Sequence, residues 1–510
     1  MPQESNMGSS RISINMIANL MQFSLRFLLG IWFTRFLIQS LSTPVYGIIP
    51  LGWNLVNYLG LITIVLNAPT GRYLIIEISK GNIDNARLIF NTVLHGVIIL
   101  CFFLLLITTC ISWYLPHVLN IPSGYITQTK YLFLSISSAF IFSTLGNPFS
   151  LATYVTNNLF LRSINEAIQQ IIRVSISVIF IYLGYKLGGV SIGIFISAII
   201  GFIITIFYWK KLTPELKIKI GFIDFSLLKE ISSMGAWMFV NKIGSLLFLN
   251  SELIVVNLLY GAKMTGIYGA ILLFPSTLRN VSQMLASNLT PPIMDRYVRK
   301  GSEELVLMLK KSIKYLGILI ALPLGLLCGF SKPILKIWLG NNFGDYAILL
   351  IILSAHLAIN LAILPLFPVQ VLLKKVALPG IITLLTGIAN IVLAIILGLP
   401  KLGLGITGIA LAGAIVLTGK NTLFTSIYSA ILLKKHIFTF FSPLKTVLML
   451  FIFTAISSYC LANFFKINNL SELIINFLIV SSIYILIVWT FIFNSLERQN
   501  VKKTVQGIFI

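Results

Sequence analysis

Fourteen apolar segments, each long enough to cross a lipid bilayer, constrain the fold of this chain more than any other feature. A transmembrane helix needs about 20 predominantly apolar residues. Such segments run over residues 13–39, 45–68, 88–114, 130–155, 164–184, 188–209, 232–258, 265–291, 313–336, 346–372, 377–398, 404–432, 443–464 and 473–494. The chain is 57% hydrophobic and 10% charged, whereas a soluble domain carries about 25% charged residues. We therefore predict an all-α, polytopic membrane protein of about 14 transmembrane helices.

Basic residues are distributed unequally between alternate loops. If the N-terminus lies in the cytoplasm, 24 lysines and arginines fall in cytoplasmic loops and 7 in outer loops. This asymmetry follows the positive-inside rule and predicts that both termini are cytoplasmic. The rule also accounts for most of the net charge of +23, so no nucleic-acid partner is needed to explain it.

Two short segments of the sequence each recur later in the chain. Thr43–Gly47 reads TPVYG, and Thr265–Gly269, 222 residues later, reads TGIYG. Lys186–Ser191 (KLGGVS) likewise resembles Lys401–Thr407 (KLGLGIT). The two pairs occur in matching order with equal numbers of apolar segments between them. Because six segments separate the copies, both start on the same side, which indicates parallel repeats about an axis near the membrane normal.

The repeat predicts the organisation of the chain. Residues 1–209 form a first six-helix lobe and residues 232–435 a second one. Residues 210–231 are basic and include Pro214, so we expect a cytoplasmic linker there. The rest, 436–510, supplies helices 13 and 14 and a cytoplasmic tail.

Six basic residues lie inside the apolar segments, where loop topology does not explain them. They are Arg26, Arg35, Arg173, Lys242, Arg279 and Lys420. A charge near the bilayer centre costs about 2.5–3.5 kcal/mol on insertion scales. We therefore predict that Arg26, Arg173, Arg279 and Lys420, contributed by both lobes, line a water-filled cavity suited to an anion. Arg35 and Lys242 lie toward segment ends, where snorkelling to the interface is the alternative.

Polar neighbours support this interpretation. Asn15, Asn19, Gln22 and Arg26 follow at steps of four, three and four, so they share one helical face. We expect the cavity to be lined also by polar side chains from both lobes: Asn19, Gln22, Asn241 and Asn280. Two alternatives stay open for the cations, namely neutralisation of Arg173 by Glu166 and, for the others, pairing with backbone carbonyls.

Glu252 is the one carboxylate well inside a segment. Such a group can carry a proton or help to bind Na⁺, and the alternative is a salt bridge to one of the buried cations. We expect no other cofactor and no metal site. The sequence has no phosphate-binding Gly-rich loop with lysine and no extramembrane stretch beyond about 25 residues. We therefore expect a protein without catalytic residues, not an enzyme.

The repeated Thr-x-Val/Ile-Tyr-Gly turn and the Gly-Val-Ser and Gly-Ile-Thr starts of the last helix in each lobe resemble a known signature. The chain resembles the polysaccharide exporters of the MOP superfamily, the Wzx-type flippases. This resemblance implies two six-helix bundles in a V plus a terminal helix pair. It also implies a cationic lumen, a description that Arg26, Arg173, Arg279 and Lys420 fit by position.

The resemblance further implies a function. Members of this family move an undecaprenyl-pyrophosphate-linked oligosaccharide from the inner to the outer leaflet of the bacterial plasma membrane, for O-antigen or other surface polysaccharides. The implied partners are this lipid-linked sugar, membrane lipids, and a polysaccharide polymerase with its chain-length regulator. The implied mechanism is alternating access of the lobes.

Three rival functions remain at this point. A multidrug exporter of the same superfamily should carry acidic residues for cationic drugs, but basic residues dominate the segments here. A flippase for the peptidoglycan lipid precursor would use the same kind of cavity. A membrane-embedded polysaccharide polymerase would more typically show a larger outer loop with grouped charged side chains.

Overall fold

The structure is a computed structural model that describes residues 2–219, 224, 226 and 242–499. In this part of the chain all regular secondary structure is helical. The described chain divides into two compact units. Unit 1 comprises residues 1–270 and 383–391, and unit 2 comprises residues 271–382 and 392–510. The predicted Asn241 and part of the predicted linker 210–231 lie outside the described residues.

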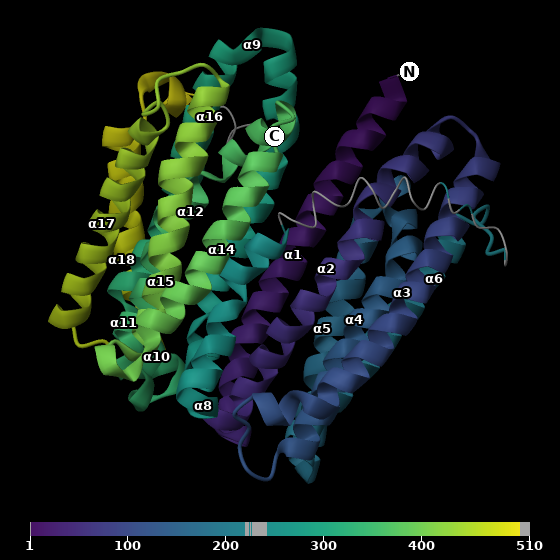
Figure 1. Ribbon diagram of the computed structural model, residues 1–510. Helices are drawn as coiled ribbons and strands as arrows, with labels where there is room; N and C mark the ends of the chain where they lie inside the picture. Colours follow the sequence, from purple (N-terminus) through teal and green to yellow (C-terminus); the bar gives the residue numbers. More distant parts are fainter. Residues whose placement is uncertain (1, 220–223, 225, 227–241, 500–510) are drawn as a thin grey trace. The chain divides into compact units, whose positions relative to one another are not determined.

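Seven long helices make up most of the part of unit 1 that the structure describes (Figure 1). They are α1 (Pro2–Leu41), α2 (Thr43–Ser79), α3 (Ile83–Val118), α4 (Ile126–Val155), α5 (Leu159–Phe180), α6 (Leu187–Leu212) and α8 (Ser251–Ile271). Helix α4 packs against α2, α3 and α6, and α5 packs against α1 and α6. A π-helical turn, Ile181–Tyr185, extends α5.

Unit 2 is built around one long helix, α9 (Leu273–Gly329). The helices that follow are α10 (Ser331–Leu339), α11 (Ala347–Ala355), α12 (Leu357–Ala362), α13 (Phe367–Leu372), α14 (Ala377–Gly398), α15 (Gly405–Gly419), α16 (Ile427–Leu432), α17 (Phe441–Phe464) and α18 (Leu470–Ile487). The middle of α14, residues 383–391, is assigned to unit 1. A π-helical turn, Lys420–Ser426, joins α15 to α16, and a second one, Val488–Ile492, extends α18.

Thirteen helices in the described part are long and apolar enough to span a membrane. Two of them reverse direction at a glycine with positive φ: α8 at Gly261 and α9 at Gly301, both with φ +74°. The bend of α9 is visible in Figure 1. The predicted segments 265–291 and 313–336 therefore lie mostly on α9, one on each side of its bend at Gly301. The predicted class, an all-α polytopic protein of about 14 helices, is confirmed, and the predicted lobe boundaries stay a prediction.

The repeated turns pack directly against each other within unit 1. A Cβ atom built on Gly266 would lie 2.0 Å from the carbonyl oxygen of Thr43, and one on Gly47 would lie 2.5 Å from the amide nitrogen of Gly266. Neither glycine has a positive φ. Glycine is required at these positions because two backbones approach closely, not because the backbone conformation demands it.

A clasp of three hydrogen bonds joins Asn120, in the loop between α3 and α4, to Asn257 on α8. The Asn120 amide donates to Asn257 Oδ1 at 2.9 Å, and Asn120 Nδ2 donates to the Asn257 carbonyl at 2.7 Å. In return Asn257 Nδ2 donates to the Asn120 carbonyl at 3.2 Å. Asn257 is 1% exposed, so these bonds form away from water. They fasten the loop between α3 and α4 to α8.

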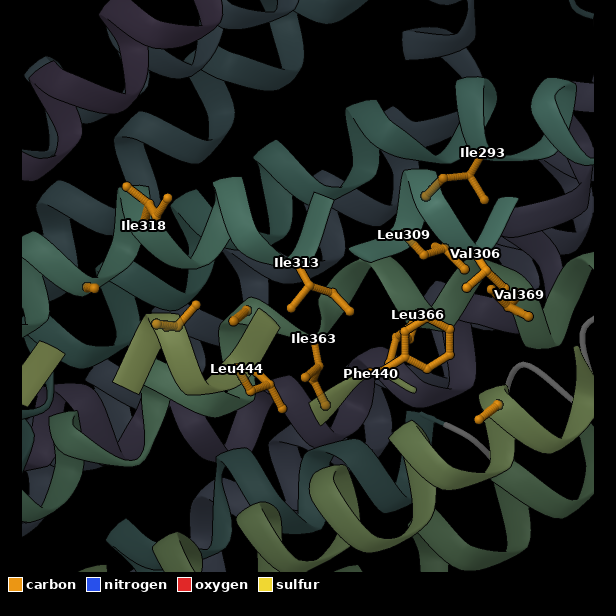
Figure 2. Packing of buried hydrophobic residues seen from close by; sticks show 14 of the residues in the cluster. Ile293, Val306, Leu309, Ile313, Ile318, Ile363, Leu366, Val369, Phe440 and Leu444 are labelled. Carbon is orange, nitrogen blue, oxygen red and sulfur yellow. The ribbon is translucent and has the colours of Figure 1, made fainter. Parts of the chain in front are cut away.

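The main apolar core of unit 2 packs α9 against α12, α13, α16, α17, α18 and the short turns between them. Figure 2 shows Ile363, Leu366 and Phe440 lying together beside the α9 residues Leu309 and Ile313. The C-terminal helix pair is fixed to α9 by close packing and by polar contacts. Cβ atoms built on three α9 glycines would meet α17 side chains at 2.2–2.5 Å: Gly317 on Val447, Gly325 on Thr454 and Gly329 on Ser458.

Polar contacts hold the last helix in place. Tyr484 Oη donates to the Ile318 carbonyl at 2.6 Å. Beyond the π-helical turn, the Glu497 carboxylate accepts from Lys314 Nζ at 2.9 Å and from Tyr315 Oη at 2.7 Å. The helices of the predicted terminal segment 436–510 are therefore anchored to α9.

Candidate cationic cavity

Helix α5 carries a polar stripe on a helix that is otherwise apolar. Its polar side chains recur at helical spacing: Arg162, Asn165, Glu166, Gln169, Gln170 and Arg173. Residues three and four apart lie on one face of a helix, so this spacing alone predicts one wet face. In a membrane protein such a face needs either a polar partner or water.

That stripe lines a cavity of about 410 Å³ in unit 1. The other walls come from α1, α2, α4 and α6. Besides the α5 stripe, the polar and aromatic lining residues are Gln22, Arg26, Trp53, Asn57, Phe140, Phe142, Ser143, Asn147, Ser150, Ser197, Phe202 and Thr205. The size falls within the range of about 300–1,000 Å³ that is usual for ligand pockets. A cavity rich in amides, hydroxyls and arginines is suited to a polar, anionic ligand.

Two predicted arginines, Arg26 from α1 and Arg173 from α5, meet in this cavity. They are close enough for the charge of Arg26 to act on Arg173. Arg173 Nη2 donates to Gln170 Oε1. Within the part of the chain that the structure describes, neither arginine takes part in an ion pair. Two like charges therefore face one polar space.

The predicted alternative, neutralisation of Arg173 by Glu166, is not the arrangement found. Glu166 Oε1 lies 3.1 Å from Arg162 Nε, one turn away on the same helix. Both residues line the cavity. Sequence spacing could not decide between the two partners, because Arg162 and Arg173 both share a face with Glu166.

Asn15 holds α1 against the turn between α4 and α5. Its Nδ2 donates to the carbonyl and side-chain oxygens of Asn157 at 3.2 and 3.1 Å, and its Oδ1 accepts from the Phe160 amide at 2.8 Å. This anchor orients the α1 face that presents Gln22 and Arg26 to the cavity. Asn19, on the same predicted face, is exposed, and its role in lining the cavity stays a prediction.

Sequence reasoning missed several lining residues. They are Trp53, Asn57, Asn147, Asn165 and Gln169. Asn165 Nδ2 donates to the Gly201 carbonyl and to Thr205 Oγ1, both at 3.0 Å, so it ties α5 to α6. The α5 stripe could have revealed two of the five, because Asn165 and Gln169 continue the spacing of Glu166, Gln170 and Arg173.

Arg279 and Lys420, the other two predicted cavity cations, belong to unit 2. Lys420 starts the π-helical turn, and its Nζ lies 5.4 Å from the ring centroid of Phe367. Arg279 is half-buried on α9, and its charge acts on His356. The neighbouring Asn280 is exposed. The convergence of these residues with Arg26 and Arg173 stays a prediction.

A buried polar network lies beside Lys420. Asn360 Nδ2 donates to Thr418 Oγ1 at 3.0 Å, and Asn421 Nδ2 donates to Asn360 Oδ1 at 2.8 Å. Asn360 Nδ2 also lies 2.9 Å from His356 Nδ1. Pi-helical turns are frequent at functional sites, so this region is the polar centre of unit 2.

The predicted coupling residue Glu252 lies on α8. Its Oε2 accepts a hydrogen bond from Tyr268 Oη at 2.5 Å, across the reversal at Gly261. Tyr268 is fully buried. Glu252 is not among the residues that line the 410 Å³ cavity. Its coupling role stays a prediction. In the described residues no cluster of His, Cys, Asp and Glu could hold a metal ion.

Sequence comparison identifies the family. The chain is 33% identical over 501 residues, 97% of its own length and 98% of the relative's, to the uncharacterized membrane protein EpsK of Bacillus subtilis (strain 168). This chain belongs to the EpsK family. No protein-family profile matches this chain.

Solved structures show which fold the EpsK family member has. It superposes on the lipid II flippase MurJ in an inward closed conformation with a TM-score of 0.64, 17% identity, and coverage of 92% of this chain and 98% of MurJ. It also matches an inward-facing multidrug resistance MATE family transporter of the MOP superfamily, with a TM-score of 0.63, 14% identity, and coverage of 83% and 98%. The EpsK-family chain therefore has the fold of the MOP-superfamily transporters.

Proposed function

We propose that this protein is a flippase that moves a polyprenyl-pyrophosphate-linked oligosaccharide from the inner to the outer leaflet of the bacterial plasma membrane. The observation that supports this most directly is the meeting of Arg26 and Arg173 in one polar cavity, with neither of them in an ion pair among the described residues. Two arginines that face water and each other are best stabilised by an anionic ligand.

The lining residues suit the head of such a lipid. The planar guanidinium fork of arginine binds two phosphate oxygens at once. Side-chain amides such as Asn57 and Asn147 can donate to and accept from sugar hydroxyls. Trp53 offers an apolar face within the same cavity. The polyprenyl tail, which is apolar, would stay in the lipid during transport, and alternating access of the lobes would carry the head across.

The charge of the cavity argues against a multidrug exporter. Its described lining includes three arginines and one glutamate, and this excess of positive charge disfavours the binding of cationic drugs. A peptidoglycan-precursor flippase would use the same chemistry, and MurJ shares the fold. The two are distinguished by offering both lipid-linked sugars in one assay. We also propose a polysaccharide polymerase and its chain-length regulator as partners, with both termini of this protein in the cytoplasm.

The test is reconstitution into lipid vesicles that contain a fluorescent polyprenyl-pyrophosphate-linked sugar. Movement between leaflets without chain growth supports a flippase, and chain growth would mean a polymerase. Arg26→Gln or Arg173→Gln should slow movement by roughly 10- to 150-fold, because a hydrogen bond to a charged group contributes about 1.5–3 kcal/mol. Arg35→Gln is the matched control, since Arg35 lies on the same helix and does not line the cavity. Equal loss in all three variants contradicts the proposal.

Release on the outer side must be driven, and we propose a proton or Na⁺ as the coupling ion, with Glu252 as its carrier. Tyr268 donates a hydrogen bond to the Glu252 carboxylate. An ion that binds to this carboxylate would have to displace that hydrogen bond or bind beside it. Glu252→Gln should remove the dependence of transport on pH or on Na⁺. Unchanged transport with unchanged pH dependence would exclude this role, and Tyr268→Phe tests the partner separately.

A further inference from the structure

The pair formed by Arg162 and Glu166 is the one feature of the cavity that the proposed function leaves unused. Arg162 Nε lies 3.1 Å from Glu166 Oε1, and the side chains are 62% and 41% exposed. Both line the cavity, together with Arg26 and Arg173. Because both side chains are partly exposed, their charges remain available to a ligand in the same space.

A purely helix-stabilising role explains the pair poorly. An acidic residue four positions before a basic one is the more favourable order in a helix, and here the arginine comes first. Exposed pairs of this kind contribute about 0.3–0.5 kcal/mol. The pair also lies on the wet stripe that faces the cavity, whereas a helix could be stabilised equally well from any other face.

We propose that the Arg162–Glu166 pair sets the charge of the ligand that the cavity accepts; this rests on the proposed function. Three arginines and one glutamate give the described lining a formal charge of +2. A pyrophosphate diester carries two negative charges. Glu166 therefore brings the cavity from three positive charges to the number that a pyrophosphate-linked lipid neutralises.

Glu166 would act on a ligand bound at Arg26 and Arg173 through its electric field and not through direct contact. Glu166 lies seven residues from Arg173 on α5, about 10 Å along the helix axis, and Arg162 lies about 16 Å away. One pyrophosphate bound at Arg26 and Arg173 is therefore out of direct contact with Glu166. At about 10 Å one unit charge changes the affinity for a monoanion by roughly 2-fold at the dielectric constant of water and roughly 16-fold at a value of 20.

Glu166→Gln should change the affinity for a dianion more than the affinity for a monoanion. A dianion experiences the same field twice, so the fold-change for a dianion is the square of that for a monoanion, roughly 4- to 250-fold. Glu166→Gln should thus bind both ligands more tightly and shift preference toward the dianion. Tighter binding also slows release, so transport turnover should fall in the same variant.

The experiment measures binding to the full-length protein in detergent with two probes, a polyprenyl-pyrophosphate-linked N-acetylglucosamine and its monophosphate-linked analogue. Glu166→Gln should strengthen binding and Arg162→Gln should weaken it. The double variant Arg162→Gln/Glu166→Gln should lie between Glu166→Gln and wild type, because the net charge is restored but the removed carboxylate is closer to the ligand than the removed arginine. Glu77→Gln is the control, since Glu77 pairs with Lys80 at 3.0 Å outside the cavity.

The outcomes separate the two ideas. A wild-type protein that binds neither probe overturns the proposed function and this inference together. Two results would overturn the charge-setting role alone, provided that the wild type binds the pyrophosphate probe. One is a double variant that binds as tightly as Glu166→Gln, and the other is a Glu166→Gln variant that changes the affinity for both probes by the same factor. In each variant, thermal unfolding in detergent reports whether the fold has been retained.

Discussion

The contact between the two repeated turns offers the sharpest stability test. Gly266 lies in the interior of a helix, where alanine is favoured over glycine by about 1 kcal/mol. Yet a Cβ atom at this position would lie 2.0 Å from the carbonyl oxygen of Thr43 and 2.9 Å from its carbonyl carbon. Both are backbone atoms and cannot rotate away. The helix or the turn must therefore move by about 1 Å or more to reach normal van der Waals distance.

We expect Gly266→Ala to lower the free energy of unfolding by about 1–3 kcal/mol, the usual cost of overpacking. Gly60→Ala is the matched control, because its Cβ would meet nothing closer than 3.7 Å. That change should be neutral or stabilising by up to about 1 kcal/mol. The double variant Gly47→Ala/Gly266→Ala should cost less than the sum of the single variants, because both strain one contact.

The measurement is reversible unfolding in mixed detergent micelles, with the three variants and the control side by side. A Gly266→Ala protein as stable as Gly60→Ala would refute the reasoning.

Two further predictions concern polar contacts. Asn257→Ala removes two side-chain bonds to Asn120 and should cost about 1–3 kcal/mol of unfolding free energy in the same assay; an unchanged value would mean that the clasp is not formed. Burial alone would raise the pKa of Glu497, but hydrogen bonds from the Asn494 amide and from Lys314 outweigh it and lower the pKa below its ordinary value of 4.5. A lowered folded-state pKa adds stability above pH 4.5 that is lost as the pH falls through the folded-state value. Glu497→Gln should therefore be less stable than wild type at pH 7 and lose less on acidification below pH 4.5, and parallel pH profiles would argue against the contact.

Hydropathy predicted the membrane crossings better than the helix ends. Apolar length reports where a chain meets lipid, whereas a helix continues as long as its backbone hydrogen bonds do. The predicted segments 265–291 and 313–336 are separated by polar sequence that includes Pro291 and Pro292, yet α9 passes through all of it and turns at Gly301. The bend occurs at one glycine, Gly301, which has a positive φ. Hydropathy averaged over many residues does not detect a single glycine.

The sequence predicted the charged residues of the candidate cavity but only some of its uncharged polar residues. Arginine in an apolar helix is costly, so Arg26 and Arg173 stand out in the sequence. Amides such as Asn57 and Asn147 are less costly and common, so nothing marked them before the walls of the cavity were known. The partner of Glu166 was undecidable from the sequence for a different reason. Two candidate arginines share one helical face with Glu166, and only side-chain geometry selects between them.

The two glycines at the contact between the turns are not equivalent positions of the five-residue repeat. Its offset of 222 residues pairs Gly47 with Gly269 and Pro44 with Gly266. Yet Cβ atoms built on Gly47 and Gly266 both meet backbone atoms of the other turn at 2.0–2.5 Å. The repeat therefore predicted that a similar turn forms twice, but it did not predict which glycine of each turn has to be small. The second repeated segment shows a different kind of contact, because a Cβ atom built on Gly189 would lie 2.9 Å from the backbone nitrogen of Ile181, only eight residues away.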